Sequence, residues 1–204
     1  MTDPVEAGPV EARLRQALSR PAGPSSDFDL NPAIHRSADK PLRPAAVLVP
    51  VWLRPEGAAL ILTKRSSHLK HHPGQIAFPG GKVDAGDAGP QAAALREAWE
   101  EIGLDPARVT ILGTLPLHET VTGFAITPFL GLIRGDFAPV PEAGEVHEVF
   151  TVPLAFALDP DRFSIQRRRW MGEWRRYYAV PYGPHYIWGA TARILRGLAD
   201  RMGR

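Results

Sequence analysis

GKVDAGDAGPQAAALREAWEEIGL, residues 81–104, is a glycine-opened loop that leads into a short helix. Pro90 suits the first turn of this helix and Gly103 its C-terminal stop, so the predicted helix spans residues 90–102. At about 100° per residue, its acidic side chains fall within an arc of roughly 100°. They are Glu97, Glu100 and Glu101. The opposite arc is apolar and consists of Leu95, Ala98, Trp99 and Ile102. The pattern predicts a helix with one core face and one carboxylate face.

The carboxylate face indicates a metal site. Like charges spaced i, i+3 and i+4 repel one another and weaken an isolated helix by a few tenths of a kcal/mol per pair, so a purely structural helix gains nothing from them. A hard cation such as Mg²⁺ or Mn²⁺ removes this repulsion and prefers oxygen ligands together with substrate phosphates. The alternative is a solvated acidic surface, which is the usual meaning of a bare ExxEE pattern. From the helix alone the solvated surface is the commoner reading, and the family resemblance described next reverses this preference, so that we predict Glu97, Glu100 and Glu101 as the metal ligands.

These residues resemble the signature of the Nudix hydrolase family, in which a glycine, a distant acid and the run REUxEExGU occur in order, with U aliphatic. The matching positions are Arg96, Glu97, Glu100, Glu101, Gly103 and Leu104. Two positions depart from the pattern: the distant acid is Asp87 with one extra residue before Arg96, and the first U is the small Ala98. The resemblance implies an α/β fold, an α/β/α sandwich around a mixed β-sheet, and metal-assisted hydrolysis of a phosphoanhydride.

A second motif precedes the first without a break. Residues 62–81, LTKRSSHLKHHPGQIAFPGG, are similar to the motif of the coenzyme A diphosphatase branch of the family, approximately LLTxRSxxLxxHxGQxxFPGG. The resemblance covers roughly residues 43–200 and implies cleavage of coenzyme A or acyl-coenzyme A into 3′,5′-ADP and (acyl-)4′-phosphopantetheine. The alternative within the family is another nucleoside diphosphate derivative, such as ADP-ribose or NADH, or a nucleoside triphosphate. A noncatalytic ligand sensor is a third reading, but such proteins commonly lose helix glutamates.

The upstream segment suits a polyanion on physical grounds. A predicted strand ends in Lys64 and Arg65 and delivers these cations to a loop that is rich in histidine and lysine. Because Arg can bind phosphate through paired donors, Arg65 is the first candidate for a phosphate contact. The loop and its motif supply the other candidate substrate contacts, which are Ser66, Lys70, Gln75 and Gly81. For each cation the alternative is an exposed solubilising side chain, and no histidine is assigned to the metal.

Three further groups extend the predicted site. Arg96 precedes the first metal ligand and is predicted to orient the glutamates by a charge-assisted hydrogen bond. In relatives a glutamate from the region of Glu145 and Glu148 reaches the metals or deprotonates water, and we favour Glu148 over Glu145; a solvated loop acid is the alternative for both. The predicted catalytic residues are therefore Arg96, Glu100, Glu101 and Glu148.

Residues 167–180, RRRWMGEWRRYYAV, indicate a hairpin around Gly172. Its aromatic residues favour a core position or a homodimer contact over stacking on adenine. The arginines at 167–169 either hold a phosphate or remain in solvent.

The length and composition of the chain exclude several classes of protein and of functional site. A chain of 204 residues is long enough for one well-buried core, and 24 basic against 22 acidic residues is too small an excess to imply a nucleic-acid partner. Because cysteine is absent, disulfides, thiolate metal sites and cysteine nucleophiles are excluded. No stretch reaches the roughly 18 apolar residues of a membrane span, and the N-terminus lacks the apolar region of a signal peptide. We expect a cytoplasmic enzyme that acts on a small molecule, without a membrane partner.

The chain divides into an N-terminal helix and linker arm, residues 1–42, and a Nudix hydrolase domain, residues 43–204. The N-terminal helix is predicted over 10–19 and a closing amphipathic helix over 186–202. The predicted strands cover 45–53, 58–65, 109–119 and 124–133.

Overall fold

The computed structural model describes residues 7–34, 41–170 and 172–203, so parts of the predicted arm, Met171 in the predicted hairpin, and the last residue lie outside the described chain. The helices are α1 (Ala7–Ser19), α2 (Pro90–Ile102), α3 (Leu154–Ala157) and α4 (Ala190–Met202). The main-sheet strands are β1 (Ser25–Ser26), β2 (Arg43–Arg54), β3 (Gly57–Arg65), β4 (Ile76–Ala77), β5 (Gly80–Lys82), β6 (Val109–Thr114), β7 (His118–Glu119), β8 (Phe124–Arg134) and β9 (Val146–Pro153). A separate hairpin consists of β10 (Ser164–Trp170) and β11 (Glu173–Ala179).

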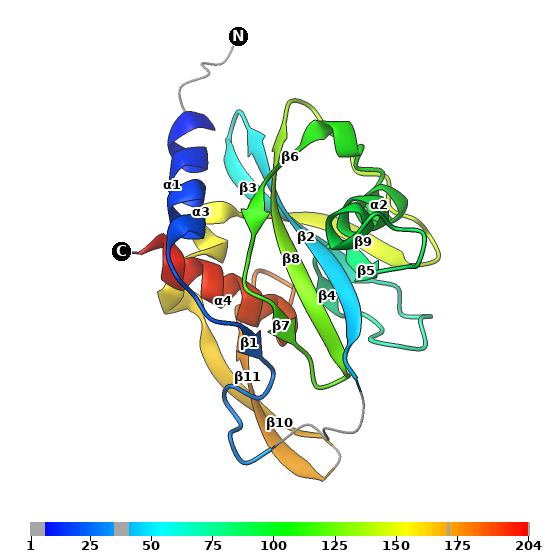
Figure 1. Ribbon diagram of the computed structural model, residues 1–204, viewed down its shortest axis with the longest axis vertical. Coiled ribbons are helices and arrows are strands. Elements are labelled where there is room, and N and C mark those ends of the chain that lie inside the picture. Colours follow the sequence, from blue (N-terminus) through cyan, green and yellow to red (C-terminus); the bar gives the residue numbers. More distant parts are fainter. Residues whose placement is uncertain (1–6, 35–40, 171, 204) are drawn as a thin grey trace.

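In the described residues the main sheet is mixed and has α2 on one face and α1, α3 and α4 on the other (Figure 1). Strand order is β1-β7-β8-β2-β3-β4, with β5 paired to β2, β6 to β8 and β9 to β3. Alternation along β2 builds both halves of the core: Ala46 and Leu48 pack with α2, whereas Val49 and Val51 pack with the helices of the other face. The predicted α/β sandwich around a mixed sheet is confirmed.

β2 positions the site because three strands meet along it. Its whole length pairs in parallel with β8, from Arg43 opposite Phe124 to Leu53 opposite Arg134. Its other edge pairs antiparallel with β3 in its second half and with the short strand β5 in its first half. The two glycines of β5 are thereby attached to the centre of the sheet.

Helix α2 has the predicted bounds. Pro90 occupies its first turn, and Gly103 ends it in the left-handed conformation at φ 69°. The Gly103 N–H donates to Trp99 O at 2.9 Å and the Leu104 N–H to Ala98 O at 3.2 Å, which closes the last turn. The expected core face is wrong in one position: Trp99 is 53% exposed, whereas Glu101 is only 4% exposed.

Other boundaries differ from the predictions for local reasons. α1 begins at Ala7, three residues before the predicted start, because Pro9 fits a first helical turn. The segment predicted as one strand over 109–119 divides into β6 and β7, with a register shift near Gly113. α4 begins only at Ala190, since Trp188 forms a bridge to Ala179 of β11. The predicted hairpin around Gly172 is confirmed as β10 and β11.

The N-terminal segment contributes to the core of the domain. Leu14 and Ala17 of α1 are buried in the same apolar cluster as residues of α4. Beyond α1, Asp27 accepts the Val121 N–H at 2.9 Å and lies 3.3 Å from His118 Nε2. These contacts hold the segment after α1 against β7 and the turn that follows it. Among the described residues, no helix combines the length and the apolar character needed to cross a membrane.

Candidate active site

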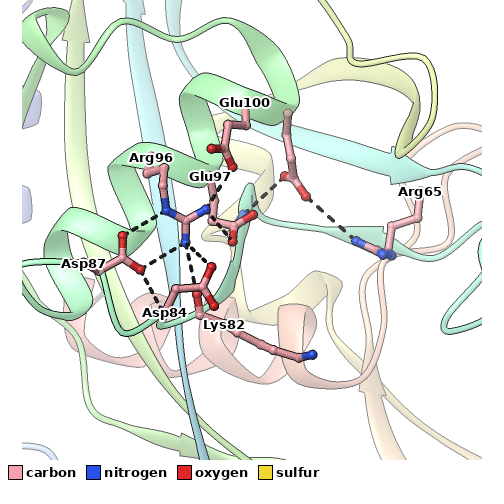
Figure 2. A network of polar contacts seen from close by, with 9 residues as sticks. Arg65, Lys82, Asp84, Asp87, Arg96, Glu97 and Glu100 are labelled. Atoms are coloured by element: carbon pink, nitrogen blue, oxygen red, sulfur yellow. Dashed lines mark hydrogen bonds and ion pairs between the residues drawn. The ribbon is translucent and has the colours of Figure 1, made fainter.

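The candidate site contains a polar network centred on Arg96 of α2 (Figure 2). Its guanidinium forms a paired contact with Asp87, Nε to Oδ1 at 2.9 Å and Nη2 to Oδ2 at 3.1 Å. Nη1 donates to Glu97 at 3.1 Å and to Glu100 at 2.9 Å. The hydrogen bond to Asp87 is the largest contribution to the raised pKa of Arg96, and the same bond lowers the pKa of Asp87. Arg96 therefore stays charged and joins the loop acid to two helix acids.

Asp87, the distant acid of the family pattern, is thus the carboxylate that forms the paired contact with Arg96. Its carboxylate also accepts the backbone N–H of Asp84 at 2.8 Å, and Asp84 Oδ2 lies 3.6 Å from Arg96 Nη2. Nη2 donates to the carbonyl oxygen of Lys82 at 3.3 Å as well. The loop between β5 and α2 is thus folded around one guanidinium. Sequence reasoning missed Asp84, although a second acid three residues before Asp87 was a visible signal.

Glu101 is the buried acid of the helix. Burial raises its pKa to about 8; the Gly80 N–H and Arg65 oppose the rise, while the charges of Glu97 and Glu145 add to it. The Gly80 N–H donates to Oε2 at 3.2 Å, and Arg65 Nη1 lies 3.8 Å from Oε1. Arg65 and Gly80 both belong to the upstream motif. The structure therefore joins the two sequence motifs at this carboxylate.

Glu97 meets the second glycine of β5. A Cβ built on Gly81 would lie 2.5 Å from Glu97 Cδ and would overlap the carboxylate oxygens, so only glycine leaves room for this acid. Burial raises the pKa of Glu97; Arg96 opposes the rise and the charges of Glu100 and Glu145 add to it. Gly81, predicted as a substrate contact, thus lies against a metal-ligand candidate.

Gly80 has a different steric reason to be glycine. Its φ is 155°, and a Cβ there would lie 2.6 Å from Val47 Cα of β2. The close approach of β5 to β2 aims the Gly80 N–H at Glu101.

The donor chemistry of this cluster suits a hard divalent cation. Every candidate donor is a carboxylate oxygen, and the raised pKa of Glu97 and of Glu101 shows that their negative charge is costly where it lies. With the side chains as they stand, no three acidic or histidine groups in the described residues converge on one metal position. Instead, Arg96 and Arg65 occupy carboxylate oxygens. The residues fit the ion by charge and ligand type, and their side chains must rearrange to converge on it.

The other predicted substrate contacts lie in the loop between β3 and β4. Ser66 is buried, and its backbone N–H donates to Glu145 O at 2.8 Å. Gln75 O accepts the Arg65 N–H at 2.9 Å, and the Gln75 N–H donates to His72 O at 3.3 Å. Lys70 is exposed at the surface of the loop. The structure brings Arg65 and Gly81 to the helix acids and leaves Lys70 and Gln75 in the surrounding loop.

The two candidate glutamates differ in position: Glu145 lies just before β9 and Glu148 lies within it. Along β9, Val149 packs on the α2 side and Phe150 on the opposite side, so Glu148 shares the face of Phe150. Its carboxylate lies 3.1 Å from Nε2 of His185, whose ring stacks on Phe150. The structure therefore does not bring Glu148 to the acids of α2.

Glu145 is the loop acid that reaches the electrostatic environment of α2. Its charge raises the pKa of both Glu97 and Glu101, in addition to the larger effect of burial. The loop is attached to the helix end, because the Glu142 N–H donates to Glu101 O at 2.9 Å. The sequence offered both acids in one segment, and only strand register could tell which one faces the helix.

Comparisons with known proteins identify the family of this chain. The family model described as NUDIX domain matches residues 42–173, more than half of the chain. NudL of Enterobacter sp. (strain 638), described as an uncharacterized Nudix hydrolase, is 47% identical over 164 residues, which cover 79% of this chain and 83% of the relative. NudL of Shigella flexneri serotype 5b (strain 8401), described in the same words, is 45% identical over 179 residues, which cover 85% of this chain and 90% of that relative.

Solved structures are similar as well. The Nudix hydrolase RenU from M. Smegmatis is 26% identical, with a TM-score of 0.48 over 56% of this chain and 73% of that chain. The match of the family model and the identity to the NudL proteins determine the assignment: the chain belongs to the Nudix family of hydrolases, which cleave phosphoanhydride bonds.

Proposed function

We propose that this Nudix hydrolase cleaves the diphosphate bond of coenzyme A or acyl-coenzyme A, giving 3′,5′-ADP and (acyl-)4′-phosphopantetheine. One observation carries the proposal: the motif similar to that of coenzyme A diphosphatases and the acidic helix form a single site. Arg65 and Gly80 of that motif contact Glu101. Gly81 makes room for Glu97. The proposed setting is the cytoplasm.

Each side chain has a proposed part in binding. Glu97, Glu100 and Glu101 would hold Mg²⁺ or Mn²⁺, which when bound supplies positive charge to the diphosphate and a lowered pKa to an attacking water. Arg65, at the edge of the acidic cluster, offers paired N–H donors to a phosphate oxygen. Arg96 positions Glu97 and Glu100 through its hydrogen bonds.

The protein groups also determine where the proton goes. Water attacks one phosphorus of the diphosphate, the bond from that phosphorus to the bridging oxygen breaks, and the other phosphate leaves. Glu145 is our candidate to accept the proton of this water at its carboxylate, since its charge acts on Glu97 and Glu101. Glu148 is replaced in this role because it faces His185 on the other side of the sheet.

A substrate panel tests the proposed activity. Purified chain with Mg²⁺ or Mn²⁺ is assayed against coenzyme A, an acyl-coenzyme A, ADP-ribose, NADH and nucleoside triphosphates, and the products are identified by mass spectrometry. We expect kcat/KM for coenzyme A or its acyl form to exceed the others by about tenfold or more, a preference worth about 1.4 kcal/mol. EDTA should abolish turnover. A preference for ADP-ribose or NADH would establish the runner-up substrate class, and a wide preference for triphosphates would refute the proposal.

A pair of isosteric variants tests the loop acid. Glu145→Gln is expected to lower kcat by about 10²-fold or more with little change in KM, because a positioned general base contributes about that much. Glu148→Gln should change kcat by less than about threefold, since its carboxylate contacts His185 instead. The two changes remove the same charge from neighbouring positions. Equal losses, or a larger loss in Glu148→Gln, would contradict the assignment of the base.

A further inference from the structure

The hairpin β10–β11 extends away from the main sheet (Figure 1) and is strongly basic. Residues 164–179 contain five arginines and a single acid, Glu173. The arginines are Arg167, Arg168, Arg169, Arg175 and Arg176. Since the whole chain has a formal net charge of only +2, the positive charge is concentrated in this element.

Strand register places arginine opposite arginine twice. Arg167 pairs with Arg176, and the next pair along the ladder is Arg168 with Arg175. Like charges directly opposite each other destabilise a sheet. Aromatic rings offset part of this cost, since Arg167, Arg168 and Arg175 each lie over one, and an anionic partner would relieve the remaining repulsion.

The two faces of the hairpin differ. On the inner face, Arg168 lies over Trp188 with 4.8 Å to the ring centroid, and the buried Arg175 lies over Phe28 at 5.3 Å. On the other face, Tyr178 packs on the core and all the other side chains are exposed. We call this the outer hairpin face; it consists of Ile165, Arg167, Arg169, Trp174 and Arg176. The body of the protein covers part of the inner face, where Arg175 and Ala179 are buried, and leaves the outer hairpin face to solvent.

The composition of the outer hairpin face limits its partner. A symmetric contact of this face with itself would set arginines against arginines, so a second copy bound in this way is disfavoured. Two large apolar side chains lie among the cations, Ile165 at 53% and Trp174 at 57% exposure. The Arg167 guanidinium lies over the Trp174 ring, 4.9 Å from its centroid, and occupies a face on which a nucleobase would stack. Ile165 offers no stacking surface.

We propose that the outer hairpin face binds peripherally to an anionic phospholipid surface. Tryptophan and isoleucine enter the boundary between headgroups and acyl chains, and arginines remain at the level of the lipid phosphates. Anionic headgroups neutralise Arg167 and Arg176, the facing pair that lies on the outer hairpin face. The contact lies on the membrane and requires no spanning segment, and it departs from the expectation that the enzyme has no membrane partner. It is independent of which diphosphate the enzyme cleaves.

Vesicle co-sedimentation of the full chain tests the proposal. We expect retention on vesicles of phosphatidylcholine with about one-third phosphatidylglycerol at low salt, release as salt is raised, and little retention on phosphatidylcholine alone. Arg167→Glu with Arg169→Glu should weaken retention by about tenfold or more. The control, Arg13→Glu with Arg108→Glu, makes the same change of charge at exposed positions outside the hairpin and should retain binding.

A second variant separates lipid from other polyanions. Ile165→Ser with Trp174→Ser should weaken vesicle retention by about tenfold while leaving any weak binding to heparin or single-stranded RNA unchanged. Thermal unfolding, measured for each variant beside the parent chain, serves as the check that the variant is folded. Equal retention on neutral and anionic vesicles, equal loss in the control, or retention by RNA without retention by vesicles would each overturn the proposal.

Discussion

Glu100→Gln is expected to fold like the parent chain and to lose hydrolytic activity by roughly two to four orders of magnitude. The Glu100 side chain is 55% exposed, and its hydrogen bond is to Arg96, which keeps its paired contact with Asp87 when Glu100 is changed. The fold therefore loses little. Removing one carboxylate from the proposed metal ligands costs several kcal/mol of transition-state stabilisation, and each 1.36 kcal/mol is tenfold in rate.

A matched control exists on α4. Asp200 accepts from Arg196 at 2.9 Å in the same i, i+4 arrangement, with 52% of its side chain exposed. Asp200→Asn removes a comparable surface ion pair remote from the site and should leave kcat/KM within about twofold. Thermal unfolding of both variants is measured beside the kinetics. Unaltered turnover in Glu100→Gln would show that the acidic face of α2 does not act in the reaction.

Gly81→Ala is expected to lower kcat/KM by about 10²-fold or more, although it adds only a methyl group. The new Cβ would overlap the Glu97 carboxylate, so this acid must leave its place between Arg96 and β5. Gly81 does not have positive φ, and alanine is therefore compatible with the backbone. A displacement of about 1 Å at a reacting group is enough for such a loss.

Gly86→Ala is the control for Gly81→Ala. Gly86 lies in the same loop region, has no neighbouring atom within 4 Å of a built Cβ, and does not have positive φ. Its replacement should leave both activity and stability nearly unchanged. Glu97→Asp combined with Gly81→Ala offers a further test, because the shorter acid draws back from the new methyl group. If Gly81→Ala is as active as Gly86→Ala, Glu97 does not need its present position.

Helix α2 shows how far the sequence could predict the site. Its bounds followed from Pro90 and Gly103, which act on the backbone of their own turns. Burial did not follow from residue type. The buried Ala98 marks the face of the helix that packs on the sheet. Glu101 lies about 60° around the helix from Ala98 and Trp99 about 100°, so Glu101 is closer to the buried face than Trp99 is. Glu101 can occupy that position because Gly80 and Arg65 provide polar partners for it.

The choice between the loop acids required information that the sequence does not hold. Glu145 and Glu148 are three residues apart, and both precede an apolar strand. The register of β9 on β3 determines on which side of the sheet each of the two acids lies. This register contains a shift between Lys64 and Arg65. A shift of one residue in such a pairing changes which side chains face α2. Local periodicity could predict that a strand follows, and only the long-range pairing could orient it.

In the proposed function, the attachment of β5 to β2 holds the glycines beside the metal-ligand candidates independently of the loop that would contact the leaving group. Hydrogen bonds to the central sheet hold the glycines beside Glu97 and Glu101. The Leu48 N–H of β2 also donates to Pro79 O at 2.9 Å. By contrast, residues 70–74 of the preceding loop are exposed. If the loop contacts the leaving group as we propose, replacements in it are expected to alter which leaving group is accommodated while the glycines of β5 stay in place. Substrate range could then diverge during evolution while the cleavage reaction is conserved.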